Sequence, residues 1–352
     1  MLYNLSKILQ PYFGPFRLLE SYVVLIGIAV FLGFSLSVFL LPKFYSFLPK
    51  DRGREFTVNP ELAMGKPTGA GFVFITLFVL LSLFLVSLTL TQFCVLALTW
   101  VVMLTGFFDD RSTKSWGEYL KGSLDLLLAV LTSVVLFYAY FKQSVEFWLP
   151  FVSHTVHIHP IVFFLVSVLI LWFSINTTNC TDGVDGLSAT LVLMALFALG
   201  IVFYFILGHI DVAEYLLVPH IEEGATWAVI SFSLVGILMG YLWHNAFPSK
   251  VLMGDAGSRA LGFFIGVMVL ISKNPFLLLM TSAIIIINGG TGLLKVVLLR
   301  FFKIKIFSSI RFPLHDHMRK NKDWSPTQVL IKFMIMQFLI TIVLFAILFK
   351  IR

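Results

Sequence analysis

Residues 70–108 read AGFVFITLFVLLSLFLVSLTLTQFCVLALTWVVMLTGFF, a run without a single charged side chain. One helix over this run would be roughly 58 Å long at about 1.5 Å per residue, whereas the hydrocarbon core of a bilayer is about 30 Å thick. The Thr and Gln residues between Leu88 and Gln92 mark a break. The run therefore predicts two transmembrane helices, over 70–91 and 93–108, joined by a tight turn.

The composition of the whole chain places it in the same class. Of 352 residues, 59% are hydrophobic and 12% are charged, whereas a soluble domain carries about 25% charged residues. We therefore predict an all-α polytopic membrane protein in which residues 1–352 form a single integral-membrane domain. The net charge of +7 does not indicate a nucleic-acid partner, because the basic residues lie in short loops, where they set topology and attract membrane lipid headgroups.

Ten segments are long and apolar enough to be read as transmembrane helices. They are 22–42, 70–91, 93–108, 122–141, 159–176, 186–206, 226–244, 258–272, 276–298 and 327–349. One alternating set of loops holds 17 of the 25 Lys and Arg residues. The positive-inside rule makes these loops cytoplasmic and both termini periplasmic, in a cell inner (cytoplasmic) membrane.

Two segments on the predicted periplasmic side are longer than tight turns. Residues 143–158 alternate at their end and predict a small hairpin, and residues 208–225 predict a polar loop with a surface helix. The chain has no internal repeat, which argues against a transporter built from two inverted halves.

Five of the 18 carboxylates lie at the predicted cytoplasmic ends of spans. They are Asp109, Asp110, Asp182, Asp185 and Asp255. A charged group at membrane level commonly costs a few kcal/mol and usually serves a function. Helix capping or pairing with a lysine would account for one such acid, but three separate clusters on one side of the membrane favour an active site.

The second cluster has a regular spacing. Asn176, Asn179, Asp182 and Asp185 follow one another at intervals of three residues. Because residues i and i+3 share a face of a helix, this spacing predicts one strip of four oxygen-bearing side chains. Gly183 would let a ligand approach the backbone closely.

Two further polar groups belong to the same side. Asp255 stands in MGDAGS (253–258), a Gly-flanked turn before a helix, where a phosphate can bind. His315, Asp316 and His317 lie in the largest basic loop, 299–326. Oxygen ligands without thiolate favour Mg²⁺ over zinc. Together these residues predict a diphosphate site with Mg²⁺ and phosphoryl transfer as its chemistry.

At these residues the chain resembles the polyprenyl-phosphate N-acetylhexosamine-1-phosphate transferases, and among them the phospho-N-acetylmuramoyl-pentapeptide transferase branch. The resemblance extends along nearly the whole chain. The matching stretches are KPTGAG (66–71), GFFDD (106–110), NTTNCTDGVDGL (176–187), KVLMGDAGS (250–258), PLHDH (313–317) and DWSPTQVLIKF (323–333).

The resemblance implies roles for individual residues. Asp109, Asp110 and Asp255 correspond to the catalytic acids and to candidate Mg²⁺ ligands, with His315 and His317 also at the centre. The implied substrate contacts are Lys66, Thr68, Lys114, Lys121, Asn176, Asn179, Asp182, Gly183, Asp185, Asn245, Leu252, Gly254 and Asp316. Asp109 is the candidate general base, and Asp110 either helps to hold the metal or orients its partner.

The resemblance also implies the reaction and the partners. Phospho-N-acetylmuramoyl-pentapeptide would pass from UDP-MurNAc-pentapeptide to undecaprenyl phosphate at the cytoplasmic face, giving lipid I and UMP, and the protein would be a homodimer. The chain departs from the family pattern at Asp316, where relatives carry histidine, and at Lys295, where they carry glutamine. We expect Asp316 to point away from phosphate and to pair with an arginine of its loop or orient a histidine, or else to accept a hydrogen bond from the uracil N–H or a ribose hydroxyl.

Two other functions are weighed against this one. A transferase for UDP-N-acetylglucosamine, or for a related amino sugar, would share most of the motifs. An ion-coupled transporter or channel would use the carboxylates as a cation pathway, but it predicts acids near the bilayer midplane, whereas these acids cluster at the ends of spans.

Overall fold

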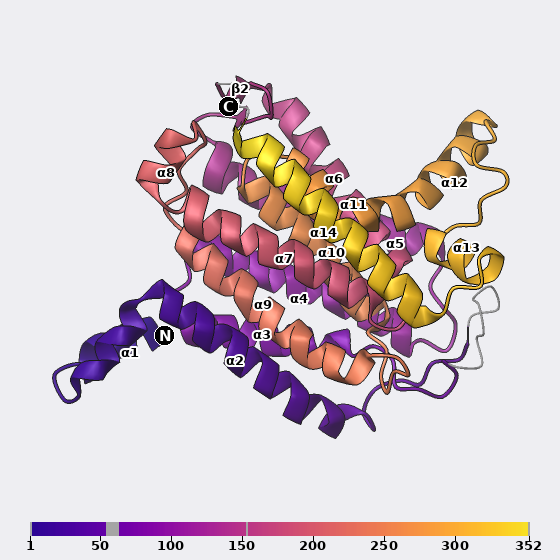
Figure 1. Ribbon diagram of the computed structural model, residues 1–352, viewed down its shortest axis with the longest axis horizontal. Coiled ribbons are helices and arrows are strands. Elements are labelled where there is room, and N and C mark those ends of the chain that lie inside the picture. The colour runs from indigo at the N-terminus through magenta and orange to yellow at the C-terminus, as the bar shows by residue number, and fades with distance from the viewer. Residues whose placement is uncertain (1, 54–62, 153, 351–352) are drawn as a thin grey trace.

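The computed structural model describes residues 2–53, 63–152 and 154–350 (Figure 1). Its α-helices are α1 (Leu2–Leu9), α2 (Tyr22–Leu40), α3 (Gly71–Leu85), α4 (Leu90–Arg111), α5 (Glu118–Leu136), α6 (Pro160–Thr181), α7 (Leu187–Ile201), α8 (Ile210–Tyr215), α9 (Gly224–Asn245), α10 (Gly254–Ile271), α11 (Phe276–Ile285), α12 (Thr291–Phe302), α13 (Leu314–Asn321) and α14 (Pro326–Lys350). Short 3₁₀ segments are η1 (Gly14–Glu20) and η2 (Leu41–Phe44), and π turns are η4 (Phe137–Phe141), η5 (Val202–Leu207) and η6 (Ile286–Gly290).

Within these described ranges, nine helical segments are long and apolar enough to cross a membrane. This confirms a polytopic all-α membrane protein. The run over 70–108 is divided as predicted, because Thr89 and Gln92 form a capping box that begins α4: Gln92 N donates to Thr89 Oγ1 (3.3 Å) and Thr89 N donates to Gln92 Oε1 (3.0 Å). The expected span over 70–91 is the shorter helix α3, whose 15 residues extend only about 22 Å.

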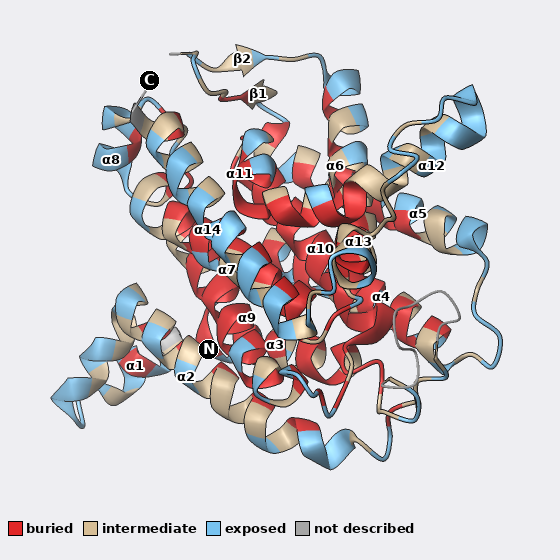
Figure 2. Cartoon of the chain, turned by 45° about the vertical axis from the view of Figure 1, so that its right-hand side comes forward, coloured by how far each residue is buried: buried red, intermediate tan, exposed pale blue. Residues whose placement is uncertain are grey.

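Helix α10 forms the centre of the bundle and is buried along its whole length (Figure 2). It packs against α3, α4, α6 and α7. Two glycines allow neighbouring helices to approach its first turn closely, since a Cβ at Gly71 would lie 2.1 Å from Gly257 N and one at Gly106 would lie 2.4 Å from Asp255 O. This packing presses the start of α10 against the end of α4, where the acidic residues lie.

The segment predicted as one span over 276–298 is bent. Helix α11 is broken at Ser282 (φ −132°, ψ 23°) and continues through η6 into α12, which extends away from the rest of the bundle (Figure 1). Gln337 of α14 bonds the interrupted backbone, because its Oε1 accepts from Ile284 N (2.9 Å) and its Nε2 donates to Met280 O (3.1 Å). The bend carries η6 toward the histidine-containing helix α13, which it contacts.

The far end of the bundle contains the two segments expected to be longer than turns. Strands β1 (Glu146–Phe147) and β2 (Val156–His157) pair as an antiparallel hairpin, which confirms the prediction for 143–158. Trp148 fixes the hairpin to the end of α10 by donating from Nε1 to Ser272 O (2.7 Å). The predicted surface helix in 208–225 is α8.

Candidate active site

A lysine lies between two acids where α4, α5 and α10 meet. Lys121 Nζ, in the first turn of α5, is 2.5 Å from Asp109 Oδ2 and 2.9 Å from Asp255 Oδ2. Both carboxylates are buried, and Asp109 Oδ1 also accepts from Trp116 N (2.6 Å). An ammonium shared by two buried carboxylates reduces the repulsion between them. Three residues separated in sequence thus form one charged centre.

Asp110 faces a different group. Its Oδ1 accepts from Asp255 N and its Oδ2 from Ala256 N, each at 3.0 Å. Both N–H groups belong to the first turn of α10, where the positive end of the helix dipole stabilises a carboxylate. Gly254 (φ +68°) makes room for it, because a Cβ at this position would lie 2.3 Å from Asp110 Oδ2. Asp110 therefore holds the backbone that carries Asp255.

Asn179 of the second cluster contacts this charged centre. Asn179 Nδ2 donates to Asp255 Oδ1 (3.1 Å) and to Ser258 Oγ (3.0 Å). Asn176, one turn earlier on α6, instead donates from Nδ2 to the carbonyl of Trp172 (2.8 Å). Asn179 is thus the member of the predicted strip that contacts the acid on α10.

The prediction that all four residues of the strip lie on one helical face is wrong for the last two. Helix α6 ends at Thr181, Asp182 is its C-terminal cap (φ −83°, ψ 60°), and Gly186 adopts φ +77°. The glycine-containing turn reverses the chain before α7 begins. Asp182 and Asp185 therefore lie in a turn, where the i, i+3 rule of a helix does not apply.

Asp185 connects this turn to two other loops. Its Oδ2 accepts from Ser249 N (3.0 Å) and lies 3.9 Å from Lys66 Nζ, which also donates to Ser249 Oγ (3.0 Å). The neighbouring backbones are paired as well, since Leu252 N donates to Pro67 O (2.8 Å) and Ala70 N donates to Leu252 O (3.1 Å). Thr68 is buried within the same loop.

Asn245, one of the implied substrate contacts, forms hydrogen bonds with two segments of backbone. Its Oδ1 accepts from Gly186 N (2.8 Å) and its Nδ2 donates to Val251 O (2.7 Å). The side chain is buried and links the turn after α6 to the loop before α10. This amide therefore shapes the site through the backbone that it holds.

The basic loop 299–326, which we call the histidine loop, contacts the turn after α6 through His315. A Cβ at Gly183 would lie 2.3 Å from His315 Nε2, so the glycine is required for this approach. Burial, with a smaller contribution from Arg319, lowers the pKa of His315 to about 3, and the ring is neutral at pH 7. Asp316 Oδ2 lies 3.8 Å from Arg311 Nε and its Oδ1 lies 3.7 Å from His315 Nε2, which confirms that it faces an arginine and a histidine of its own loop.

Three other polar residues lie apart from the charged centre. His317 Nδ1 accepts from Arg311 N (3.3 Å) and so orders the loop. Lys114 is exposed, and its carbonyl accepts from Ser112 Oγ (2.7 Å). Lys295 donates to the carbonyls of Phe307 and Ile310, each at 2.9 Å. None of these contacts places the side chain beside Asp255.

A buried ion pair one helical turn deeper was not predicted. Arg259 Nη2 lies 2.5 Å from Asp125 Oδ1, and both side chains are at most 3% exposed. Arg259 follows Asp255 by four residues on α10, and Asp125 follows Lys121 by four residues on α5. The pair therefore repeats the α5–α10 bridge with the charges exchanged. Charged residues inside the spans were the sequence signal for it.

Removing one member of this pair should destabilise the protein. Asp125→Leu leaves the Arg259 guanidinium buried without its carboxylate, which is expected to cost about 3–5 kcal/mol. The double variant Asp125→Leu/Arg259→Leu should cost much less, because it buries no unpaired charge. The midpoints of thermal unfolding in detergent would test this, and equal losses in the single and double variants would contradict it.

The described parts of the chain contain no group of three or more His, Cys, Asp or Glu residues arranged to hold a metal ion. Of the three acids expected to hold the metal ion, Asp110 directs its carboxylate onto the start of α10. Asp109 and Asp255 do converge on one cation, Lys121. Mg²⁺ is commonly bound by one or two carboxylates together with substrate phosphates and water, so these two acids fit it.

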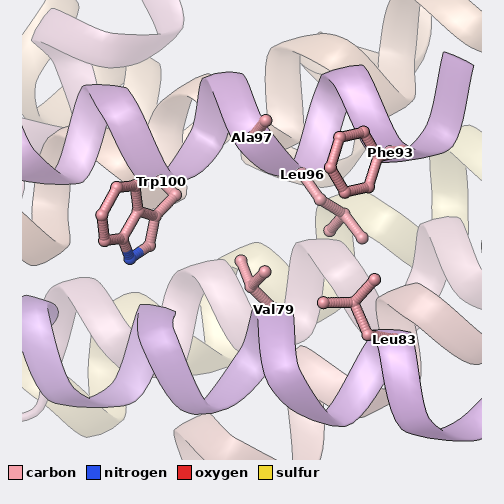
Figure 3. A pocket seen from close by; sticks show the side chains of 6 residues that line it. All are labelled: Val79, Leu83, Phe93, Leu96, Ala97 and Trp100. Atoms are coloured by element: carbon pink, nitrogen blue, oxygen red, sulfur yellow. The ribbon is translucent and has the colours of Figure 1, made fainter. Parts of the chain in front are cut away.

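An apolar recess between α3 and α4 lies apart from this chemistry (Figure 3). It is lined by Val79, Leu83, Phe93, Leu96, Ala97 and Trp100. The one polar atom among these side chains, Trp100 Nε1, donates to Thr76 Oγ1 (3.1 Å). The recess offers no charged group to a phosphate or a metal ion.

Comparison with known proteins identifies the family. Residues 92–273 match the model of glycosyl transferase family 4. The phospho-N-acetylmuramoyl-pentapeptide-transferase of Treponema pallidum is 60% identical over 344 residues, covering 98% of this chain and 95% of the relative. The chain belongs to the phospho-N-acetylmuramoyl-pentapeptide transferase family. The enzyme of that name from Campylobacter jejuni is 32% identical over 87% of this chain and 89% of its own, and the one from Sulfurimonas denitrificans is 30% identical over 95% and 96%.

The match to glycosyl transferase family 4 spans most of the charged centre. It includes α4 from Gln92 onward and the whole of α5, α6 and α10, and therefore Asp109, Lys121, Asn179 and Asp255. The histidine loop lies outside that range but inside the alignment with the Treponema transferase, which covers nearly the whole chain.

Proposed function

We propose that this protein transfers phospho-N-acetylmuramoyl-pentapeptide from UDP-MurNAc-pentapeptide to undecaprenyl phosphate, giving lipid I and UMP. The observation that carries the proposal is the Asp109–Lys121–Asp255 centre in a chain that is 60% identical to a transferase of that name. Buried charges at the ends of membrane helices suit a reaction between a soluble nucleotide and a lipid phosphate.

The reaction exchanges one phosphoanhydride bond for another. An oxygen of the lipid phosphate bonds to the β-phosphorus of the nucleotide sugar, and the bond from that phosphorus to the bridging oxygen breaks, releasing UMP. Asp109 receives a proton from the attacking phosphate or orients it, and Lys121 offsets the charge of the phosphates. Asp110 positions Asp255 through the first turn of α10.

Mg²⁺ is the proposed cofactor, held by Asp255 and Asp109. The ion supplies charge neutralisation on the diphosphate oxygens. Asn179 fixes one oxygen of Asp255 through its hydrogen bond, which limits the orientations open to the carboxylate. The other residues of the site are proposed to bind the nucleotide sugar or to shape its pocket. They are Lys66, Thr68, Lys114, Asn176, Asp182, Gly183, Asp185, Asn245, Leu252, Gly254, His315, Asp316 and His317.

The proposed topology has ten spans with both termini periplasmic. It is supported by the opposite directions of α2 and α14, which bring the two termini to one side of the bundle (Figure 1). An even number of crossings is then required, and α3 supplies the tenth beside the nine longer helices of the described chain. The site lies at the opposite end, which the basic loops assign to the cytoplasmic face of the inner membrane.

A transfer assay separates the two transferase hypotheses. Purified protein in detergent is mixed with undecaprenyl phosphate, Mg²⁺ and either radiolabelled UDP-MurNAc-pentapeptide or radiolabelled UDP-N-acetylglucosamine, and the label in the lipid phase is counted. We expect lipid labelling from the muramoyl donor only. Labelling from UDP-N-acetylglucosamine alone would establish the alternative, and labelling from neither would reject both.

We also propose a homodimer, by analogy with the family. Native mass spectrometry from nanodiscs tests the oligomeric state directly. A single monomeric species across a tenfold range of protein concentration would exclude it.

A further inference from the structure

A buried asparagine in the bent ninth span contacts the histidine loop. Asn288 lies in the π turn η6 and is fully buried. Its side-chain amide lies against both the backbone and the ring of His315: Asn288 Oδ1 is 2.8 Å from His315 N, and Asn288 Nδ2 is 3.1 Å from His315 Nδ1. One amide thus contacts two groups of the same histidine.

The backbone contact fixes which way the amide faces. His315 N–H can only donate, so the atom 2.8 Å away must be the amide oxygen. The amide nitrogen, which carries two hydrogens, then faces His315 Nδ1. His315 Nδ1 lies 3.1 Å from both amide atoms. The amide oxygen already accepts from His315 N, whereas the amide nitrogen has a hydrogen to donate, so the ring is favoured with Nδ1 bare and accepting from Nδ2.

The other side of the ring agrees with this assignment. A neutral imidazole with Nδ1 bare carries its proton on Nε2. His315 Nε2 lies 3.7 Å from Asp316 Oδ1, and a carboxylate favours an N–H over a lone pair. The same nitrogen lies against Gly183, where a Cβ would come within 2.3 Å. The N–H is therefore presented at the turn that contains Asp182 and Asp185.

We propose that Asn288 is a positioning residue that holds His315 as the Nε2–H tautomer, so that the ring offers a hydrogen-bond donor to an acceptor oxygen of the nucleotide sugar. The proposal rests on the proposed function for its ligand, but the tautomer is a property of the protein alone. The bend between α11 and α12 makes this contact possible, because it places Asn288 of η6 beside His315.

Nuclear magnetic resonance of ¹⁵N-histidine-labelled protein in bilayers tests the tautomer without substrate. The His315 signal is identified by its loss in His315→Gln. We expect Nε2 protonated in the natural sequence. In Asn288→Asp the carboxylate only accepts, so the proton should move to Nδ1. A natural protein with Nδ1 protonated would overturn the proposal, whichever sugar nucleotide the enzyme uses.

Turnover of the same variants tests whether the tautomer matters. We expect Asn288→Asp and Asn288→Ala to lower kcat by about 10–100-fold, the usual range for a partner that orients a functional histidine. Asn274→Asp, at an equally buried asparagine by the opposite end of α10, is the matched control and should leave both tautomer and kcat unchanged. A displaced proton in Asn288→Asp with normal turnover would refute the role of the N–H. If Asn288→Asp fails to fold, the spectrum of the natural protein still tests the tautomer, and the kcat of Asn288→Ala still tests the role of Asn288 in turnover.

Discussion

Asp255→Asn is expected to lower turnover by at least about 100-fold. Replacing groups that only orient a metal ligand already costs about 10–100-fold, and Asp255 is proposed to bind the ion directly. The amide would also disturb its neighbours, since one end of Asp255 accepts from Asn179 Nδ2 and the other pairs with Lys121 Nζ. An amide nitrogen facing either donor would be repelled.

The measurement is steady-state lipid labelling across a series of Mg²⁺ concentrations. Asp255→Asn should stay inactive at Mg²⁺ concentrations that saturate the natural enzyme. Asp211→Asn makes the same chemical change on the exposed helix α8 and should behave like the natural sequence. Turnover of Asp255→Asn within a few-fold of normal would remove this acid from the catalytic centre.

Lys121→Met is expected to separate turnover from metal binding. Without the ammonium, Asp109 and Asp255 face each other with their mutual repulsion uncompensated, so a dication should bind between them more tightly. Turnover should nevertheless fall by about 100-fold or more, because the phosphates lose a fixed positive charge. The expected pattern is thus a lower kcat together with a lower Mg²⁺ concentration for half-maximal activity.

Lys142→Met supplies the control for this experiment. Lys142 is exposed just beyond the other end of the same span, so its loss should change neither quantity. If Lys121→Met instead required more Mg²⁺ than the natural enzyme, the lysine would be assisting the metal rather than competing with it. Normal turnover in this variant would show that the ammonium serves only to hold α5 against α10.

The membrane class and most of the spans could be predicted from the sequence alone, and the loop charges predict the side of the membrane on which the acids gather. The apolar length of a segment and the charge of a loop are counted from consecutive residues. Neither depends on which helices contact one another, so both can be predicted from the sequence. The break at Thr89–Gln92 could also be predicted, because a capping box is a local contact between residues three apart in the sequence. The six motif stretches identified the family in the same way.

What each polar residue faces could not be predicted from the sequence, because it depends on how the helices pack. Adjacent in sequence, Asp109 and Asp110 look equivalent, yet one pairs with Lys121 and the other accepts from the first turn of α10. The Asp125–Arg259 pair and the Asn288–His315 contact join residues far apart in the chain. Such contacts follow from how helices pack through close approaches such as that of Gly106 to Asp255, and packing depends on the shapes of several helices at once rather than on the spacing within any one of them.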